Sequence, residues 1–506
     1  LMAEGKIKKD KPLPPISGDE KPFDLPRGWE WARLGFIGYT QTGSTPNKSN
    51  SESFGSDMPF IKPGDIYPNY VEYNNEGLSF YGAEQAGRIA HSGSLLMVCI
   101  GTIGKCNLVE RNCSFNQQIN SITPYVFDSQ YLLSVCRSVY FHTEAWSRSS
   151  STTIPILNKG NWEEICIPVP PIVEQHRIVT KVDELMALCD QLENQHINAA
   201  ETHEKLVSHL LGTLTQSQNA DDFSANWQRI AAHFDTLFTT KASIDALKQT
   251  LLQLAVMGKL VPQDSNDEPA SKLLKRIQAE KAKLVAEGKI KKDKPLPPIT
   301  EEEKPFELPR GWEWVRLQSV IDVRDGTHDS PKEAEGETTS YPLVTSKDFF
   351  EGGINFDTAR RISEADHSEI SKRSLVEKYD ILFSMIGGNI GNQVMVRDDR
   401  PFSVKNVALF KYYDRNLTFP FFIKKYMENL AVSLQSSAIG GAQPFITLGT
   451  LRNLVMALPP LSEQHRIVTK VDELMTLCDQ LKSRITQTGQ LQKKLADVVV
   501  EQAIAS

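Results

Sequence analysis

The sequence predicts an α+β protein in which two α/β domains are joined by long helices. Three observations lead to this prediction. Long stretches of the chain recur almost letter for letter, apolar residues follow a heptad spacing after each of two proline-rich turns, and the two segments between the repeats carry short strand-like runs separated by Gly, Asn and Pro. The 506 residues and the 40% hydrophobic content suit a chain of about three globular units.

The repeat sets the plan of the chain. The letters AEGKIKKDKPLPP at 3–15 return at 286–298, and KPFDLPRGWEWARL at 21–34 returns as KPFELPRGWEWVRL at 304–317. A second pair is EQHRIVTKVDELMALCDQL at 174–192 and EQHRIVTKVDELMTLCDQL at 463–481. The segments between these connectors resemble each other only faintly. We therefore expect two domains with similar tasks and different specificities.

Five regions follow from the repeat and the changes of pattern. They are a linker with the end of a truncated helical region at 1–22, a first domain at 23–171, a central helical spacer at 172–305, a second domain at 306–460, and a C-terminal spacer helix at 461–506.

The helical regions are predicted from apolar spacing. Ile178, Val182, Leu185, Cys189 and Leu192 begin a heptad pattern, and its repeat copy begins at Ile467. A further apolar stripe stops at Gly258, and another helix opens at Asp267-Glu268-Pro269 and runs to Gly288. With a polar link near 215–240, the central block is predicted to form an antiparallel coiled-coil hairpin.

The chain ends copy parts of this hairpin. Residues 461–506 correspond to its first helix and residues 1–5 to the end of its last. Side by side, the two ends would rebuild one hairpin, which predicts a circular, pseudo-two-fold arrangement. Counterparts of 241–283 are absent ahead of Leu1, so we expect the natural N-terminal helix to be missing.

Strands and short helices are predicted inside the two domains. Strand-like runs lie at 94–100, 119–126 and 380–386, and short helices are expected at 129–145 and 419–435. The letters IGTIG at 100–104 can be laid against IGGNIG at 386–391, and IPIL at 154–157 against QPFI at 443–446.

Composition excludes several protein classes. The net charge of −7 excludes binding to nucleic acid through bulk positive charge. The seven cysteines form no CxxC pair, which indicates free thiols in a reducing cytoplasm, and no apolar run is long enough to span a membrane.

No signature of autonomous catalysis or metal binding is found. GTIGK at 101–105 is too short for a phosphate-binding P-loop, and the proline pairs VPP and LPP lack the Asn or Asp that an amino-methyltransferase places before Pro-Pro. His196 and His203 lie on the helical seam, where a structural role is expected.

Two motifs, each present twice, resemble a known family. LPRGWEW stands at 25–31 and 308–314, and PPIVEQHRI at 170–178 returns as PPLSEQHRI at 459–467. In this order, with helices between, they resemble the specificity (S) subunit of Type I restriction–modification enzymes.

The resemblance implies a division of labour. Each variable domain would be a target recognition domain that reads one half of a bipartite site in double-stranded DNA. The chain itself would be noncatalytic and would bind no cofactor or metal. Two methyltransferase (M) subunits would use S-adenosylmethionine to methylate adenine, and two restriction/translocase (R) subunits would use ATP and magnesium. The assembled complex would be a DNA adenine methyltransferase and an ATP-dependent endonuclease in the cytoplasm.

The helices would fix the spacing of the half-sites, because a rigid connector sets the distance between two reading domains. They would also dock the methyltransferase subunits. The candidate docking residues are Ile178, Val182, Leu185, Leu192, Ile467, Val471, Leu474 and Leu481.

The DNA contacts are expected to be local, because residues 23–170 carry ten Lys and Arg against 13 Asp and Glu. Base edges are read by Arg, Lys, Asn and Gln, and phosphates by hydroxyl and amide groups as well. The candidates in the first domain are Gln41, Ser44, Thr45, Lys48, Lys62, Asn116, Gln117, Asn120, Arg148, Ser150, Thr152 and Lys159. Those in the second domain are Arg324, Thr327, His328, Lys347, Asn389, Lys405, Asn406 and Gln443.

Some interpretations stay open. The basic run at 6–11, repeated at 289–294, could bind phosphate, but a solvated linker is the favoured interpretation. Two other functions are a specificity region detached from a single-chain restriction–methylation enzyme and a coiled-coil scaffold that reads no DNA.

Overall fold

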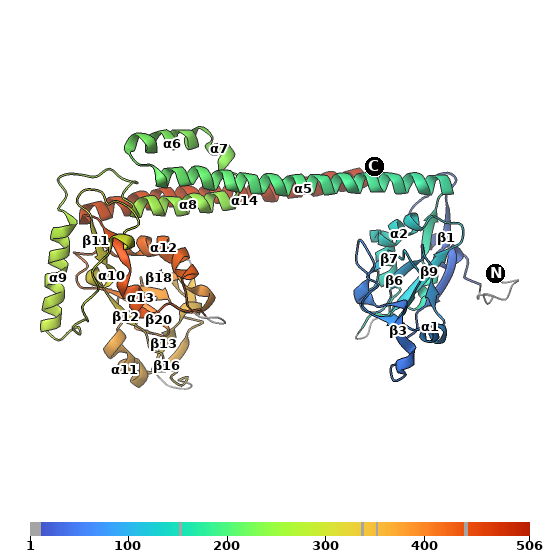
Figure 1. The fold of residues 1–506 in the computed structure, drawn as a ribbon, viewed down its shortest axis with the longest axis horizontal. Helices are drawn as coiled ribbons and strands as arrows, with labels where there is room; N and C mark the ends of the chain where they lie inside the picture. Colours follow the sequence, from blue (N-terminus) through green and yellow to red (C-terminus); the bar gives the residue numbers. More distant parts are fainter. Residues whose placement is uncertain (1–11, 151–153, 335–338, 351–352, 440–443, 506) are drawn as a thin grey trace. The chain divides into compact units, whose positions relative to one another are not determined.

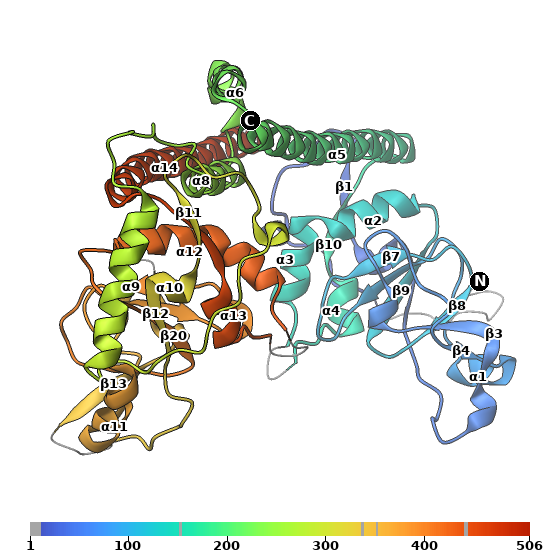
Figure 2. The same ribbon diagram turned by 60° about the vertical axis from the view of Figure 1, so that its left-hand side comes forward.

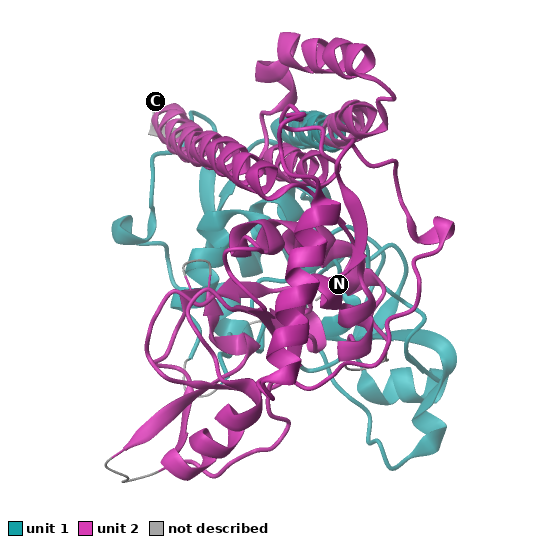
Figure 3. Ribbon diagram, turned by 90° about the vertical axis from the view of Figure 1, so that its left-hand side faces the viewer, with its two compact units in different colours: residues 1–197 teal, residues 198–506 magenta. Residues whose placement is uncertain are grey.

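The computed structural model describes residues 12–150, 154–334, 339–350, 353–439 and 444–505. The chain divides into two compact units, Leu1–Ile197 and Asn198–Ser506 (Figure 3). The first unit contains the first domain and the beginning of a long helix. The second contains the second domain and most of the helical region.

Domain 1 is built on a four-stranded antiparallel sheet. Its order is β2 (Gly38–Thr42), β9 (Ile119–Pro124), β6 (Leu95–Val98) and β7 (Cys106–Leu108). A second sheet has the order β4 (Gly77–Leu78), β3 (Phe54–Ile61), β8 (Cys113–Phe115) and β5 (Ile89–Ala90), and β1 (Glu30–Arg33) pairs with β10 (Cys166–Val169). The helices are α1 (Phe80–Ala86), α2 (Ser129–Arg137), α3 (Val139–Ser147) and α4 (Lys159–Glu163), with short 3-10 turns η1 (Gly18–Glu20), η2 (Leu34–Phe36), η3 (Ser51–Ser53) and η4 (Pro63–Asp65).

Strand β6 contributes to two of the apolar cores of domain 1. All four of its residues are buried. Because side chains alternate along a strand, Leu95 and Met97 join the core that contains helix α2, while Leu96 and Val98 join the core with β8. The strands predicted at 94–100 and 119–126 are confirmed. The single helix predicted at 129–145 is wrong in one respect: it is two helices, because Ser138 leaves the helical conformation and caps α3.

Domain 2 repeats this architecture. Its main sheet has the order β12 (Ile321–Asp325), β20 (Val407–Tyr412), β17 (Ile381–Ser384) and β18 (Gln393–Met395). Smaller sheets are β16 (Arg360–Ser363), β13 (Ser340–Val344) and β19 (Ser403–Val404), then β14 (Phe349–Phe350) with β15 (Gly353–Ile354), and β11 (Glu313–Arg316) with β21 (Val455–Leu458). The helices are α10 (Leu317–Val320), α11 (Glu364–Ser374), α12 (Pro420–Ser436) and α13 (Leu448–Asn453), with η5 (Glu301–Glu303), η6 (Ser346–Asp348) and η7 (Gly387–Asn389).

The faint similarity between the domains is real in three dimensions. The amide of Gly101 donates to the Pro155 carbonyl at 3.0 Å, and that of Gly387 donates to Pro444 at 2.8 Å. Ile100 bridges to Ile156 as Ile386 bridges to Phe445. Both glycines have positive φ, at 81° and 76°. The two alignments predicted from the sequence are therefore confirmed.

Six further helices, two of them 45 residues long, make up most of the remaining described chain (Figure 1). They are α5 (Ile172–Gln216), α6 (Ala220–Ala232), α7 (Phe234–Leu237), α8 (Lys241–Val256), α9 (Ala270–Ala286) and α14 (Leu461–Ala505). Helix α8 ends just before Gly258, which has a φ of 70°, as predicted. The polar link predicted at 215–240 is wrong: Asn219 caps α6, and Ile230, Leu237 and Phe238 are buried in a shared core.

Within the second unit, α8 and α14 run antiparallel, side by side (Figure 2). Lys482 pairs with Asp245 at 2.7 Å, and Lys248 pairs with Asp479. The second half of α5 contributes Val207 and Leu211 to the same apolar cluster. The antiparallel hairpin was predicted within 172–305; the antiparallel pair defined by these ion pairs instead joins α8 to α14, which lies outside that block.

The repeated motifs hold each domain to its helix. Gln175 accepts from the amide of Asp128 ahead of α2 and donates to Pro170, and Gln464 makes the same two kinds of bond to Phe419 ahead of α12 and to Pro459. The glutamine of each PPxxEQ motif therefore ties the start of a long helix to its domain.

A proline-rich strap precedes each domain. We use "strap" for residues 12–20 and 295–303. The carbonyls of Pro14 and Pro15 accept from Arg33, and those of Pro297 and Pro298 accept from Arg316. The basic run at 289–294 is mostly exposed, as expected for a solvated linker, but the prolines that follow it are clamped to the domain. Residues 6–11 lie outside the described part of the chain.

Candidate nucleic-acid interface

One edge of the main sheet in each domain gathers polar loops. Because neighbouring strands are antiparallel, the end of β2, the start of β9 and the β6–β7 turn meet at the same edge. The bridges of Ile156 to Ile100 and Ser150 bring a fourth segment there. We call this the loop edge; in domain 1 it comprises 43–50, 99–105, 116–118 and 148–156, and in domain 2 326–330, 385–392, 405–406 and 439–445, apart from the undescribed residues.

In domain 1, hydroxyl and amide groups connect the loops. The Thr45 hydroxyl donates to Gln117 Oε1 at 2.5 Å, and Thr42 donates to Asn120 Oδ1 at 2.8 Å. A Cβ at Gly43 would collide with the backbone carbonyl of Asn116, so this close approach requires glycine.

In domain 2, a histidine occupies the corresponding place. His328 Nδ1 lies 3.0 Å from Asn406 Oδ1, and its Nε2 lies 2.8 Å from Asp325 Oδ2, both within hydrogen-bond distance. Since both ring nitrogens face acceptors, the Asn406 bond first and then Asp325 raise the pKa of His328 above its ordinary value. Asn406 has a φ of 58°, a conformation that Asn tolerates better than most residues.

The two loop edges share a backbone plan and differ in chemistry. Gly43 and Gly326 each follow the edge strand, and their amides donate to Ile119 and Val407 at the start of the paired strand. Beyond them, domain 1 presents the hydroxyl and amide groups of Thr45 and Gln117 with Lys48 nearby, whereas domain 2 presents the His328 imidazole with Lys405, which donates to Ser330. Two different sets of contacts can therefore be made by one architecture.

About half of the predicted residues are available at or beside these edges. Lys48, Gln117, Ser150, His328, Lys347 and Asn389 are exposed, and Ser44, Thr45, Lys405 and Asn406 are partly exposed. Lys347 lies in η6 after β13, next to the strand that leads to Lys405.

Four predicted residues are buried and shape the loops instead. The side chain of Gln41 donates to the Ile89 carbonyl, and the side chain of Asn116 both donates to the side chain of Gln118 and accepts from its amide. Asn120 Oδ1 accepts from the Thr42 hydroxyl, and the Thr327 hydroxyl accepts from the amide of Asp329. All four are less than 9% exposed. Their polarity satisfies internal groups, so direct contact with a duplex is not expected in this conformation.

Four predicted cations are already paired. Arg148 contacts Glu144 and Glu20, Lys62 contacts Glu76, Lys159 contacts Glu163 at 2.8 Å, and Arg324 contacts Asp322 at 2.7 Å. These pairs reduce the charge left for phosphates. Thr152 and Gln443 lie outside the described residues.

Reasoning from the sequence missed three participants. Lys105 lies in the β6–β7 turn, donates to the Pro63 carbonyl at 2.8 Å and lies 5.6 Å from the centre of the Tyr67 ring. Tyr67 in turn stacks on Tyr70 with ring centres 4.6 Å apart. The sequence signal for Lys105 is its place in GTIGK at 101–105, a glycine-rich turn after a strand-like run.

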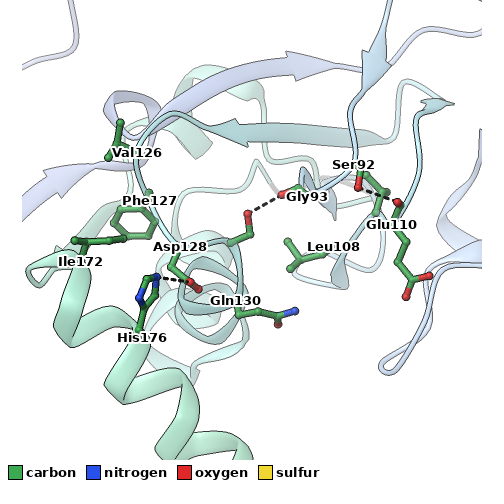
Figure 4. Close-up of a pocket in the computed structure, with 12 residues that line it drawn as sticks. Ser92, Gly93, Leu108, Glu110, Val126, Phe127, Asp128, Gln130, Ile172 and His176 are labelled. Carbon is green, nitrogen blue, oxygen red and sulfur yellow. Dashed lines mark hydrogen bonds and ion pairs between the residues drawn. The ribbon is translucent and has the colours of Figure 1, made fainter.

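A pocket of about 540 Å³ lies at the opposite edge of the domain 1 sheet (Figure 4). It is lined by the start of α2 and the start of α5, where His176 Nε2 lies 3.2 Å from Asp128 Oδ2. Within the described ranges, no group of three or more His, Cys, Asp or Glu is placed to hold a metal ion. Because the pocket lies at the opposite edge of the sheet, it is separate from the polar loops.

Comparisons with known proteins decide the family. The sequence model of the Type I restriction modification DNA specificity domain matches residues 26–202 and 309–488. The chain belongs to this family. Its two matched ranges each combine one recognition domain with the start of one long helix.

Relatives within the specificity family span the whole chain. It is 37% identical to the Type I restriction enzyme EcoAI specificity subunit of Escherichia coli, covering 100% of this chain and 87% of the relative. It is 35% identical to the EcoEI specificity subunit of the same organism with the same coverage. A solved chain from work on complex assembly and conformational transition of the type I R-M system has 19% identity and a TM-score of 0.53 over 95% of this chain and 99% of that one, which supports the fold.

The candidate docking residues of this specificity subunit differ between the two repeats. Val182, Leu185 and Leu192 on α5 are at least 36% exposed, and Ile178 is partly buried against domain 1. Ile467 and Val471 on α14 are fully buried, and Leu474 and Leu481 pack on the cluster that contains α8. The second set is therefore occupied within its own unit. No described helix is long and apolar enough to cross a membrane.

Proposed function

We propose that this specificity subunit reads a bipartite site in double-stranded DNA, with one half-site at each loop edge. The observation that carries the proposal is the pair of equivalent sheet edges with different polar side chains. Hydroxyl, amide, imidazole and ammonium groups are the donors and acceptors that recognise base edges and phosphates. A shared backbone plan with distinct chemistry suits two related readings of different sequences.

Helix α5 supports the role of a spacer. It is a single 45-residue helix that leaves domain 1 and enters the second unit. A stiff connector places the second reading domain at high effective concentration once the first has bound. An insertion of one heptad into its exposed part adds about 10 Å of helix, which corresponds to roughly three base pairs. We expect a longer gap between half-sites in that variant.

We assign the catalytic steps, adenine methylation and DNA cleavage, to partner subunits. We propose that this chain is noncatalytic and binds no cofactor, and that two methyltransferase subunits supply S-adenosylmethionine-dependent adenine methylation. Two restriction/translocase subunits would add ATP- and magnesium-dependent cleavage in the cytoplasm. Support comes from the relatives, which are named as subunits of Type I restriction enzymes. The exposed stripe at Val182, Leu185 and Leu192 is an available docking face for such helical partners.

Mapping of methylated adenines tests the function directly. Cells that express this chain with its methyltransferase subunit should carry a methylated motif made of two short sequences and a fixed gap. Cells that express the methyltransferase alone are the control. A continuous motif would contradict two separate readers, and no sequence-specific methylation would favour a scaffold that reads no DNA.

A further inference from the structure

A short hairpin follows β3 in domain 1 and β13 in domain 2 (Figure 1). In domain 1, Ile66 bridges to Val71 directly after η4. In domain 2, β14 pairs with β15 directly after η6. We call residues 66–71, and β14 with β15, the aromatic hairpins, because each of them exposes an aromatic ring.

One buried aspartate holds each hairpin in the same way. The side chain of Asp65 accepts from the amide three residues before it at 2.8 Å, and the side chain of Asp348 does so as well, also at 2.8 Å. The carbonyls of these aspartates accept from the amides seven residues later, those of Glu72 and Asn355, at 2.7 and 2.8 Å. Two domains of faint sequence similarity therefore build this hairpin with the same bonds.

Each aromatic hairpin begins beside the loop edge. The amide of Asn116 donates to the Ile61 carbonyl at the end of β3 at 3.0 Å, and the amide of Lys405 donates to the Val344 carbonyl at the end of β13 at 2.9 Å. The hairpin starts five residues after either carbonyl. In domain 2, both β14 and β15 also contact β18, the strand that follows the loop 385–392. A duplex held at the loop edge is therefore within reach of the hairpin.

The aromatic rings stand at the same position in the two hairpins. Tyr67 is the second residue of its hairpin, is 39% exposed and stacks on Tyr70, which is 51% exposed. Phe350 is the second residue of the other hairpin and is 57% exposed. Because a ring on an exposed hairpin is removed from water only when a partner covers it, these positions favour a binding surface.

Cations stand beside the exposed rings. Lys347 and Arg360 line, together with Phe350, a pocket of about 420 Å³. Both are exposed, and neither forms an ion pair with a residue in the described ranges. In domain 1, Lys105 lies 5.6 Å from the centre of the Tyr67 ring and likewise forms no ion pair within the described part of the chain. Each hairpin thus combines an apolar ring with positive charge that is not neutralised.

An arginine also covers the aromatic residue that follows each hairpin. Arg111 lies 4.4 Å from the centre of the Tyr73 ring, and Arg400 lies 4.6 Å from that of Phe356. Both rings stand eight residues after the buried aspartate. Arg400 lies 3.8 Å from Asp398, which reduces its free charge. The pairing of ring and guanidinium group is therefore repeated along with the hairpin.

We propose that the aromatic hairpin of each domain is a second DNA contact, which binds the sugar–phosphate backbone outside the bases read at the loop edge. The ring of Tyr67 or Phe350 packs against deoxyribose. The neighbouring cations pair with phosphates: Lys105 in domain 1, and Lys347 and Arg360 in domain 2. A ring beside cations fits the alternation of apolar sugar and anionic phosphate, and such a contact carries no base preference. This inference rests on the proposed function, because it concerns the same duplex.

Phosphate ethylation interference tests the contact in the complex of this chain with its methyltransferase subunits. On a duplex with the mapped site, ethylation of phosphates that flank each half-site should weaken binding of the wild type. The Phe350→Ala, Arg360→Ala variant should lose this interference beside one half-site only, and the Tyr67→Ala, Lys105→Ala variant beside the other. Each variant should bind roughly tenfold more weakly, by the same factor for duplexes with and without the site.

Matched variants make the test specific. Phe350→Tyr keeps the ring and should keep the interference pattern of the wild type. Arg360→Gln removes only the charge and should reduce the slope of log affinity against log salt by about one. Arg310→Ala is the charge control, because Arg310 is exposed and precedes β11, outside the main sheet and the hairpin. Copurification with the methyltransferase subunit checks that each variant still assembles.

The inference and the proposed function fail in different ways. Binding of the wild type without preference for any sequence would overturn the proposed function and this inference with it. Specific binding whose flanking interference survives in both double variants would overturn the inference alone. Loss of discrimination between bases in a hairpin variant would show that the hairpin reads bases, and loss of the methyltransferase subunit would assign the hairpin to a protein contact; either result would overturn a backbone contact.

Discussion

Arg316 forms two parallel hydrogen bonds with the carboxylate of Glu303, at 2.7 and 2.8 Å, and Arg33 forms the same pair with Glu20 at 2.6 and 2.9 Å. Each arginine also donates to three backbone carbonyls, two in the strap and one before the last strand of its domain. Both guanidinium groups are less than 9% exposed. A single side chain thus fastens the strap to each domain, which explains why Arg, Glu and Pro-Pro recur together.

We call the bonds that Arg33 or Arg316 makes to its strap and domain the arginine clamp. Loss of the clamp at Arg316 should destabilise the second domain. Arg316→Ala leaves three carbonyls without their donor, and we expect the free energy of unfolding to fall by about 2–4 kcal/mol. Urea unfolding followed by fluorescence measures the change. Arg310→Ala is the matched control, because Arg310 is exposed, and its effect should stay within about 0.5 kcal/mol. Equal effects of the two substitutions would contradict the clamp.

The clamp should weaken in acid. The bonds from Arg33 and Arg316 lower the pKa of Glu20 and of Glu303 to about 2 from 4.5. A lowered pKa means that the stabilisation is complete above pH 4.5 and is lost as the pH falls toward 2. The difference in urea midpoint between the wild type and the Glu20→Gln, Glu303→Gln double variant should therefore shrink between pH 5 and 2. A difference that stays constant across that range would show that the carboxylates do not titrate with the clamp.

His328 should make DNA binding depend on pH. Its neighbours raise its pKa, so the charged ring persists below that pKa and is lost as the pH rises through it. In the complex with the methyltransferase subunits, affinity for the mapped site should decline with rising pH, and His328→Gln should flatten that decline while weakening binding by roughly 1–3 kcal/mol. Fluorescence anisotropy at several pH values measures both effects. An unchanged pH profile would remove His328 from the interface.

Lys48 and Lys347 should act through phosphates. Both are exposed: Lys48 lies in the loop after β2, and Lys347 lies in η6 after β13, near the loop edges. Each Lys→Ala change should weaken binding to all sequences alike and reduce the slope of log affinity against log salt by about one. Lys159→Ala is the control, since Lys159 is paired with Glu163. A loss confined to the specific site would instead indicate contact with a base.

Much of the fold follows from the sequence, because the repeat and the apolar spacing are local signals. Gly258 and Pro269 were sufficient to predict where α8 ends and where α9 begins. Helices α6 and α7 were missed because their apolar residues are sparse and become recognisable only where they pack on α5 and α8.

The candidate site was harder to predict because polarity does not tell whether a side chain faces solvent. Gln41 and Asn120 lie on strands and turn inward, while Thr45 and Gln117, a few residues away, remain accessible. Val182 and Val471 show that, on helices too, the sequence does not tell whether a side chain is buried or exposed. They share a sequence context, and only the presence of α8 beside one of them separates the buried residue from the exposed one.

The central claim is that each loop edge reads its own half of one site. It is tested most directly by measuring binding to a panel of duplexes with one base pair changed at each position of the mapped site. The panel is applied to a Thr45→Ala, Gln117→Ala variant of domain 1 and a His328→Ala, Asn406→Ala variant of domain 2. We predict that each variant loses discrimination in one half-site and keeps it in the other, and that the two variants affect opposite halves. Loss of discrimination in both halves by either variant, or in the same half by both, would contradict the account.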